Sequence, residues 1–131
     1  RHSADSGFAG CCPFHGDCLE GLAAGPSLEA RTGIRGENIP QDHEVWDIQA
    51  FYIAQIAVNT TLALAPEQIV FGGGVMAQEH MIKRVRQQFE AQLAGYVALP
   101  SALTDYLVTP SILDNGSATI GNFALAARLA K

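Results

Sequence analysis

The sequence predicts an α/β fold. Two short runs rich in β-branched and aromatic residues, 68–71 and 106–109, are typical of strands. Helical patterns precede, separate and follow these runs, and this alternation indicates an α/β sandwich rather than a helix bundle or an all-β domain. Two strands are few for a complete sheet, so we expect the chain to contribute edge strands to a larger one.

Composition narrows the class of protein. The 131 residues are 48% hydrophobic and 16% charged, which is enough apolar material for a core of ordinary domain size. The net charge of -5, with only Lys83, Arg84 and Arg86 clustered, argues against a nucleic-acid partner. No uncharged apolar run approaches the roughly 20 residues that span a bilayer, and no secretion signal is recognisable. We therefore expect a soluble, cytoplasmic protein with no membrane partner.

The N-terminal third begins without periodicity. Residues 1–18 contain Gly, Pro and Cys but no regular apolar spacing, which predicts an irregular loop. From Asp17 the pattern becomes helical, and it is interrupted at Gly25. A second short helix is predicted over residues 26–31, with a proline in its first turn and Gly33 as its stop.

A long helix and a strand form the middle of the chain. Asp42 is a candidate N-cap for the helix, which we expect to end near Leu64 because Pro66 follows. Residues 68–71 then predict a buried strand that enters a tight glycine turn. The apolar positions of the helix include Val45, Trp46, Ile48, Ile53, Ile56 and Val58.

An amphipathic helix and a final helix complete the pattern. Between residues 77 and 93, Ile82, Val85, Phe89 and Leu93 recur at helical spacing, opposite a polar face. After the second predicted strand, the turn 114–116 introduces a helix of small residues, 117–129. His43 and His80, on predicted helix starts or polar faces, are interpreted as surface histidines.

Cys12, His15 and Cys18 form the clearest chemical motif. Their spacing lets a tight loop direct two thiolates and one imidazole to a common point, a ligand set that suits zinc. One ligand of a tetrahedral site is missing. Cys11 and His2 are local candidates, although adjacent cysteines rarely point the same way and His2 lies on an unpatterned terminus.

Two other interpretations of this motif remain open. The three residues could be chance neighbours in a loop, although three soft ligands within seven residues are unusual. Cys18 could be a nucleophile activated by His15, but no third partner is visible. An odd number of cysteines, all in one short segment, does not suit a disulfide scaffold.

Glu20 follows the motif at the start of a predicted helix. There the helix dipole lowers the cost of its negative charge, so Glu20 can be a simple first-turn carboxylate. If a metal-bound loop fixes the helix start, Glu20 instead becomes a rigidly held acceptor for the hydroxyls of a polar ligand.

Glycines mark two further candidate sites. Gly72, Gly73 and Gly74 lie between a predicted strand and a predicted helix, where bare backbone can approach a phosphate. Such turns also carry glycine for purely steric reasons. Asn115 and Gly116 form a second turn, which could face the same ligand or simply begin a helix.

The run from Gly10 to Gly33 resembles the zinc-loop segment of fructokinases of the ROK family. The resemblance is long and continues through Glu44–Trp46, Tyr52–Gln55, Leu64–Pro66, Ile69–Met76 and the terminal Ile120–Gly121, so it covers nearly the whole chain. It implies an actin-like, ribonuclease-H-like ATPase fold. Residues 1–24 would form the zinc loop and the sugar-side helix, and residues 25–131 a further portion of the C-terminal α/β domain.

The resemblance also implies roles for the candidate residues. Cys12, His15 and Cys18 would be zinc ligands, and the family's fourth ligand, a histidine in a Gly-His pair, would lie just upstream of the first residue. Glu20 would bind the sugar. The turn Gly72–Gly74 would line the nucleotide site, joined by Asn115 and Gly116.

The activity implied is the ATP- and magnesium-dependent phosphorylation of a hexose, with fructose 6-phosphate as the favoured product. The family's catalytic aspartate has no match here, so we expect this chain to be the C-terminal part of a kinase and to be inactive alone. The expected partners are fructose, ATP, the missing N-terminal half and a second copy in a homodimer. Sugar-responsive regulators and glucose or mannose kinases of the same family are alternatives, but they typically carry Cys-x-Cys-Gly where this chain has Cys12-Pro-Phe-His15.

Overall fold

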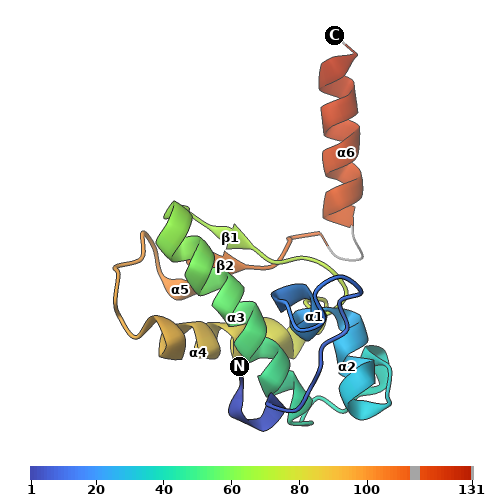
Figure 1. Cartoon of the computed structure of the whole chain (residues 1–131). Coiled ribbons are helices and arrows are strands. Elements are labelled where there is room, and N and C mark those ends of the chain that lie inside the picture. The colour runs from blue at the N-terminus through green and yellow to red at the C-terminus, as the bar shows by residue number, and fades with distance from the viewer. Residues whose placement is uncertain (113–115, 131) are drawn as a thin grey trace.

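The computed structural model describes residues 1–112 and 116–130. Helices dominate, and two short strands form a parallel sheet beside the longest helix (Figure 1). The predicted alternation of helices and strands is confirmed. The helices are α1 (Leu19–Ala23), α2 (Gly25–Thr32), α3 (Val45–Leu64), α4 (Glu79–Leu93), α5 (Leu103–Tyr106) and α6 (Gly116–Leu129), and the strands are β1 (Ile69–Val70) and β2 (Leu107–Val108).

The core lies between α3 and α4. Along α4, Met81, Val85, Phe89 and Leu93 recur every four residues, and all four are buried, which gives the helix one apolar face. This face packs against the buried side of α3 and against the sheet. The residues of this core on α3, α5 and the sheet include Trp46, Ala50, Ile53, Ala54, Ala57, Tyr106 and Leu107.

The sheet is shorter and more open than predicted. Ile69 pairs with Leu107 and Val70 with Val108, and the pairing continues as the Phe71 N–H donates to the Val108 carbonyl at 2.8 Å. The prediction of a buried first strand was wrong, because Val70 is 54% exposed. Both strands run the same way, so their carboxyl ends lead together into the glycine turn and toward Pro110.

Two predictions about polar residues near α3 and α4 were wrong. Asp42 does not cap α3; instead His43 Nδ1 accepts a hydrogen bond from the Val45 N–H at 3.1 Å. His80 is not a surface histidine, because its ring packs edge-on against Trp46 with 4.9 Å between ring centres. Both His80 ring nitrogens are buried, and neither has a hydrogen-bond partner among the described residues.

The final helix, α6, is confirmed within one residue of its predicted start. Figure 1 shows it standing away from the rest of the molecule, and none of its described residues is buried. Ile120, Phe123 and Leu125 are all more than half exposed. Within the part of the chain that the structure describes, no helix is both long enough and apolar enough to cross a membrane.

Candidate functional site

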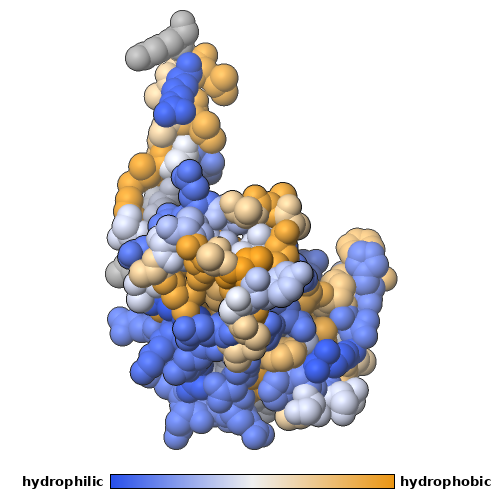
Figure 2. Space-filling model, turned by 90° about the vertical axis from the view of Figure 1, so that its left-hand side faces the viewer, coloured by the Kyte–Doolittle hydropathy of each residue, from blue (hydrophilic) through white to orange (hydrophobic). Residues whose placement is uncertain are grey.

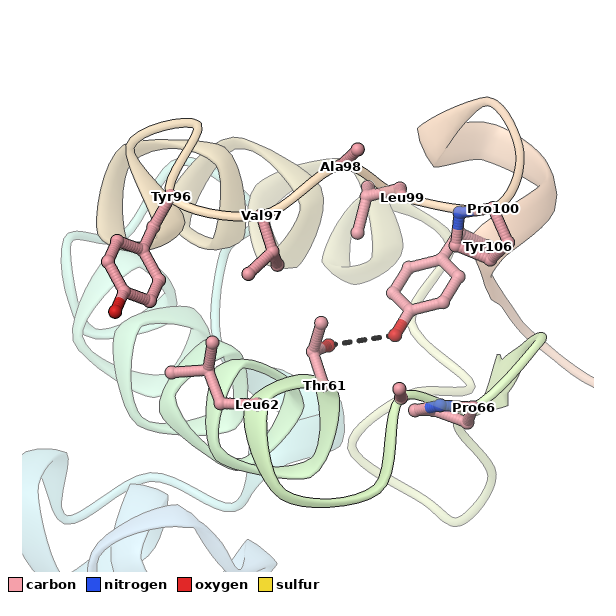
Figure 3. A pocket seen from close by; sticks show the side chains of 10 residues that line it. Thr61, Leu62, Pro66, Tyr96, Val97, Ala98, Leu99, Pro100 and Tyr106 are labelled. Atoms are coloured by element: carbon pink, nitrogen blue, oxygen red, sulfur yellow. Dashed lines mark hydrogen bonds between the residues drawn. The ribbon is translucent and has the colours of Figure 1, made fainter.

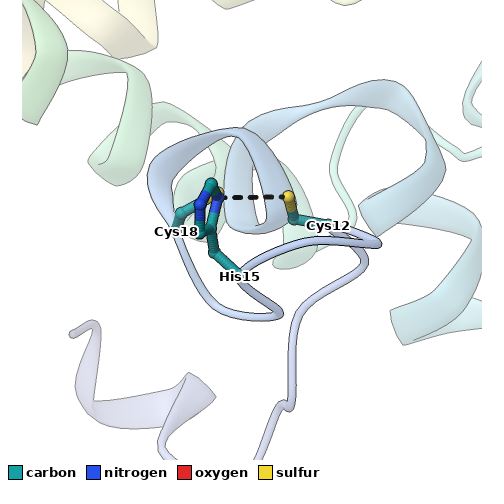
Figure 4. A group of neighbouring side chains, drawn as sticks. All are labelled: Cys12, His15 and Cys18. Atoms are coloured by element: carbon teal, nitrogen blue, oxygen red, sulfur yellow. Dashed lines mark hydrogen bonds between the residues drawn. The ribbon is translucent and has the colours of Figure 1, made fainter.

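The structure brings Cys12, His15 and Cys18 together on one loop (Figure 4). Their candidate ligand atoms all lie within 4.8 Å of one another, with 3.8 Å between Cys12 Sγ and His15 Nδ1. This group could hold one metal ion. Cys11 and His2, the two local candidates for a fourth ligand, lie outside it.

The backbone of this loop is folded tightly. Cys12 and Gly16 exchange two backbone hydrogen bonds of 3.1 and 2.9 Å, which closes the turn between the first two ligands. Gly10 has a φ of 82°, and a Cβ there would overlap with the Gly16 carbonyl. A Cβ on Gly21 would overlap with the same carbonyl, so the first turn of α1 is packed directly against the loop.

The loop also favours the thiolate that a metal requires. The backbone N–H groups of His15, first, and of Phe14 lower the pKa of Cys12 to about 7, assisted by Cys18 and the His15 ring and opposed by burial. A substantial fraction of this thiol is therefore ionised at neutral pH. Sequence reasoning identified the ligand set but not this backbone contribution.

Glu20 and the glycine turn, which are far apart in the sequence, line the same hollow. Glu20 is exposed in the first turn of α1. It borders a space of about 310 Å³ together with Gly72, Gly73 and Gly74. The other walls of the hollow are apolar, and they include Leu19 and Ile53. Glu20 and the bare backbone of the glycine turn are therefore the groups here that could bind hydroxyl or phosphate groups of a ligand.

The glycine turn is only partly explained by the fold itself. Gly73 has a φ of 97°, which favours glycine. A Cβ on Gly72 would make only ordinary contact with Pro110, at 3.6 Å, and a Cβ on Gly74 would meet no described atom within 4 Å. Since neither position needs glycine for internal packing, the purely steric interpretation accounts for one glycine of the three.

The second glycine turn is described only in part, because Asn115 lies outside the described residues. Gly116 is the first residue of α6. Its neighbour Ser117 borders a hollow of about 470 Å³ that also contains Gly72 and Gly73. The start of α6 and the glycine turn therefore face a common space.

A separate apolar hollow of about 530 Å³ lies at the other end of the sheet (Figure 3). Leu62, Val97 and Leu99 contribute to its walls, and a 2.8 Å hydrogen bond joins the hydroxyls of Thr61 and Tyr106. Figure 2 shows hydrophobic residues gathered on the face of the molecule that includes this end. Pro66 and Tyr106, which line this hollow, precede the two strands. Ligands of open α/β sheets bind beyond the carboxyl ends of the strands, so the candidate site is the one on the glycine-turn side.

Sequence reasoning missed a buried ion pair between the N-terminal turn, Ser3–Asp5, and α2. Arg31 donates to both carboxylate oxygens of Asp5, at 2.9 and 2.8 Å, and the two side chains are only 6% and 4% exposed. Burial raises the pKa of Asp5, but the hydrogen bonds from Arg31 and Tyr52 and the Arg31 charge outweigh it, so this pKa is lowered overall. Asp5 and Arg31 are 26 residues apart, and no local pattern connects them.

These features together define a class of protein: an α/β chain with a Cys/His metal loop, an adjacent carboxylate and a strand-to-helix glycine turn. The chain belongs to the ROK family, whose family model matches residues 2–129. The resemblance inferred from the sequence is thereby confirmed, and with it the actin-like fold class of that family.

Bacterial fructokinases are homologous to the chain. It is 64% identical over 124 residues to a fructokinase of Streptococcus mutans, covering 95% of this chain and 42% of that protein. It is 56% identical over 126 residues to a fructokinase of Lactococcus lactis subsp. cremoris (96% and 43%), and 40% identical over 128 residues to a fructokinase of Zymomonas mobilis (96% and 42%). The chain thus spans less than half the length of these relatives.

Proposed function

We propose that this chain forms part of an ATP-dependent hexose kinase that converts fructose to fructose 6-phosphate. The observation that carries the proposal is the hollow shared by Glu20 and the glycine turn, beside a metal loop, in a chain 64% identical to a fructokinase. A carboxylate suits sugar hydroxyls, and exposed backbone at a strand-to-helix turn suits phosphate.

The Cys12, His15 and Cys18 side chains would hold a structural zinc ion. The donor set fits, because two thiolates and an imidazole are typical zinc ligands and their atoms already converge. Bound zinc would hold the loop closed, and the fourth ligand would come from outside this group. Packing between Gly21 and the loop then transmits the loop's position to α1 and Glu20.

Glu20 and the glycine turn would have separate tasks. Glu20 accepts hydrogen bonds from the sugar hydroxyls and orients the hexose. Backbone N–H groups at Gly72–Gly74 approach the nucleotide, and Gly116 begins the helix on the same side. Asn115 is kept as a nucleotide-site residue from the family resemblance alone, and magnesium accompanies ATP. In the transfer, the sugar's 6-hydroxyl oxygen bonds to the γ-phosphorus, the bond to ADP breaks, and the hydroxyl proton passes to a base.

No residue of this chain is assigned as that base, and we place it in the remaining part of the kinase. Phosphoryl transfer depends on positioning and charge neutralisation together. We therefore expect residues 1–131 alone to be inactive, and the proposed active enzyme to be a homodimer of the longer protein.

Kinetics of the full-length protein test the proposal. Fructose should be phosphorylated with a higher kcat/KM than glucose or mannose. Glu20→Gln should lower kcat/KM for fructose about 10- to 100-fold, because hydrogen bonds to a charged group contribute about 1.5–3 kcal/mol. Glu90→Gln, on the exposed side of α4, is the control. It should change neither kcat/KM for fructose nor the preference for fructose over glucose and mannose.

Equal or reversed sugar preference would contradict fructose as the substrate and favour a glucose or mannose kinase. Absence of any sugar phosphorylation, together with sugar-dependent DNA binding, would instead support the regulator class.

A further inference from the structure

A buried polar cluster lies between the N-terminal segment, α2 and α3. We call it the Asp5 cluster; its members are Asp5, Ser27, Arg31, Gln49 and Tyr52. Arg31 binds both oxygens of Asp5, and the Tyr52 hydroxyl donates to Asp5 Oδ2 at 2.9 Å. Arg31 Nη1 also donates to Ser27 Oγ at 2.9 Å. Asp5, Ser27, Gln49 and Tyr52 are all at most 5% exposed, so these bonds are shielded from water.

One side of the Asp5 cluster holds the end of α1, the helix that carries Glu20. Ser27 Oγ lies 3.0 Å from the Leu22 carbonyl and 2.7 Å from the Ala24 carbonyl. Gln49 Nε2 donates to the Ala23 carbonyl between them. Three consecutive carbonyls at the helix end, which α1 itself cannot satisfy, therefore meet the cluster.

The other side of the Asp5 cluster holds the entry to the metal loop. Asp5 lies in the N-terminal turn, Ser3–Asp5, and its carbonyl accepts from the Phe8 N–H at 3.2 Å. The Arg31 guanidinium also stacks over the Phe8 ring at 4.1 Å from its centre. Phe8 immediately precedes the loop, so the ion pair contacts the entry of the loop directly. Through the bond from Arg31 to Ser27, it is also linked to the end of α1, the helix that follows the loop.

A buried apolar group could fill this space, but it could not donate to the α1 carbonyls as the Ser27 hydroxyl and the Gln49 amide do. It could not place a cation over the Phe8 ring either. Removing one charge of such a pair leaves the other buried and unpaired. Hydrogen-bond networks in a shielded interior also fix geometry more sharply than apolar packing does.

We propose that Asp5 and Arg31 are positioning residues that set the location of Glu20 for the sugar, by anchoring the metal loop at both of its ends. The inference rests on the proposed function, because it takes Glu20 as a sugar-binding residue. It adds a second support for Glu20, distinct from the metal ligands.

The test uses the full-length kinase and the variants Asp5→Asn, Tyr52→Phe, Glu20→Gln and the double variant Asp5→Asn/Glu20→Gln. Asp5→Asn keeps the shape of the side chain and removes its charge. We expect the KM for fructose to rise about 10-fold, which corresponds to a loss of about 1.4 kcal/mol of sugar binding. The KM for ATP and the zinc content should not change. In the Glu20→Gln background, Asp5→Asn should have no further effect.

Asp47→Asn is the matched control. It removes the carboxylate of a second Asp–Arg pair, the one between Asp47 and Arg84. The Asp47 side chain is more than half exposed, and the pair is remote in sequence from the loop. We expect no change in the KM for fructose. Tyr52→Phe removes one bond to Asp5 and should raise the KM for fructose 2- to 3-fold, which keeps the test available if Asp5→Asn fails to fold.

Several results would overturn the inference. If Asp5→Asn lowers the melting temperature without changing the KM for fructose, the role of Asp5 is purely structural. A parallel rise in the KM for ATP, or multiplying effects in the double variant, would exclude action through Glu20. If Glu20→Gln alone has no effect, Glu20 does not bind the sugar, and the inference fails with the proposed function. If Glu20→Gln raises the KM for fructose but neither Asp5→Asn nor Tyr52→Phe does, only the positioning role is overturned.

Discussion

The metal loop and the α3–α4 pair are ordered by different forces. In the fully described stretch 9–18, Cys12 is the one buried residue, and Phe14 is 87% exposed. Along α3 and α4, by contrast, Trp46, Val85 and Phe89 are at most 1% exposed. The helix pair is held by apolar burial, whereas the loop depends on ligands, hydrogen bonds and close glycine contacts. Each region should therefore lose its structure under conditions that leave the other folded.

The largest expected effect is in the helix pair. Phe89→Ala should lower the free energy of unfolding by about 3–5 kcal/mol, because it leaves a cavity between α4 and the sheet. Urea denaturation measures the change. Gln87→Ala, on the exposed side of the same helix, should stay within about 0.5 kcal/mol of the parent protein. A small effect of Phe89→Ala would mean that apolar burial does not dominate this region.

The next effect concerns the loop. Cys18→Ser in the full-length protein should reduce zinc from about one ion per chain to nearly none, measured by elemental analysis. For a metal present at 100 times its Kd, the stabilisation lost is about 2.7 kcal/mol. Limited proteolysis should then cut within residues 9–18 while the α3–α4 pair stays protected.

Cys11→Ser is the control for the loop, because Cys11 lies outside the ligand group. It should retain the metal. Loss of zinc in Cys11→Ser, or its retention in Cys18→Ser, would contradict the proposed ligand set.

A smaller effect is expected where α3 meets α5. Tyr106→Phe removes the buried hydrogen bond between the Tyr106 and Thr61 hydroxyls. Thr61 still donates to the Ala57 carbonyl at 2.8 Å, so no orphaned donor remains, and the loss should be about 1 kcal/mol. Tyr96→Phe, at an 81% exposed position, should have almost no effect in the same thermal or urea measurement. A loss well above that of an ordinary hydrogen bond would show that the ring also changes its packing.

The smallest effect is a pH dependence within the helix pair. Burial, and secondarily the Arg84 charge, lowers the pKa of His80 below its ordinary 6.5, although Asp47 opposes this. Below about pH 6.5 the unfolded chain binds a proton that the folded chain does not, so stability should decrease as the pH falls from 7.5 to 5.

Unfolding curves of the parent protein and His80→Phe across that pH range test this sign. The phenyl ring can keep the contact with Trp46 and cannot take up a proton. His80→Phe should therefore show a weaker pH dependence, and an unchanged slope would place the titration on another group.

Local patterns predicted the parts of the molecule that local physics decides. Pro66 and Gly33 marked the ends of α3 and α2, the four-residue spacing of Val85, Phe89 and Leu93 marked the α4 core face, and the ligand spacing marked the metal loop. Long-range contacts decided the rest. The burial of His80 depends on Trp46, which lies on another helix.

The same limit applies to the site. Glu20 and the glycine turn were each identified from the sequence, but not their shared hollow, which depends on how α1 lies against the turn that follows β1. Tyr106 was predicted to lie in a strand, but it is the last residue of the short helix α5. The sequence did not reveal this helix because four residues are too few to show a helical period.

Gly10 and Gly21 have a consequence for anyone who varies or transplants this loop. Both would direct a Cβ at the carbonyl of Gly16, although neither carries a side chain that could bind anything. In a library covering every position and selected for metal retention, these two positions should tolerate substitution as poorly as the ligands do. A graft onto another scaffold should therefore move residues 10–21 as a unit, since the ligand triplet without its two glycines would not close.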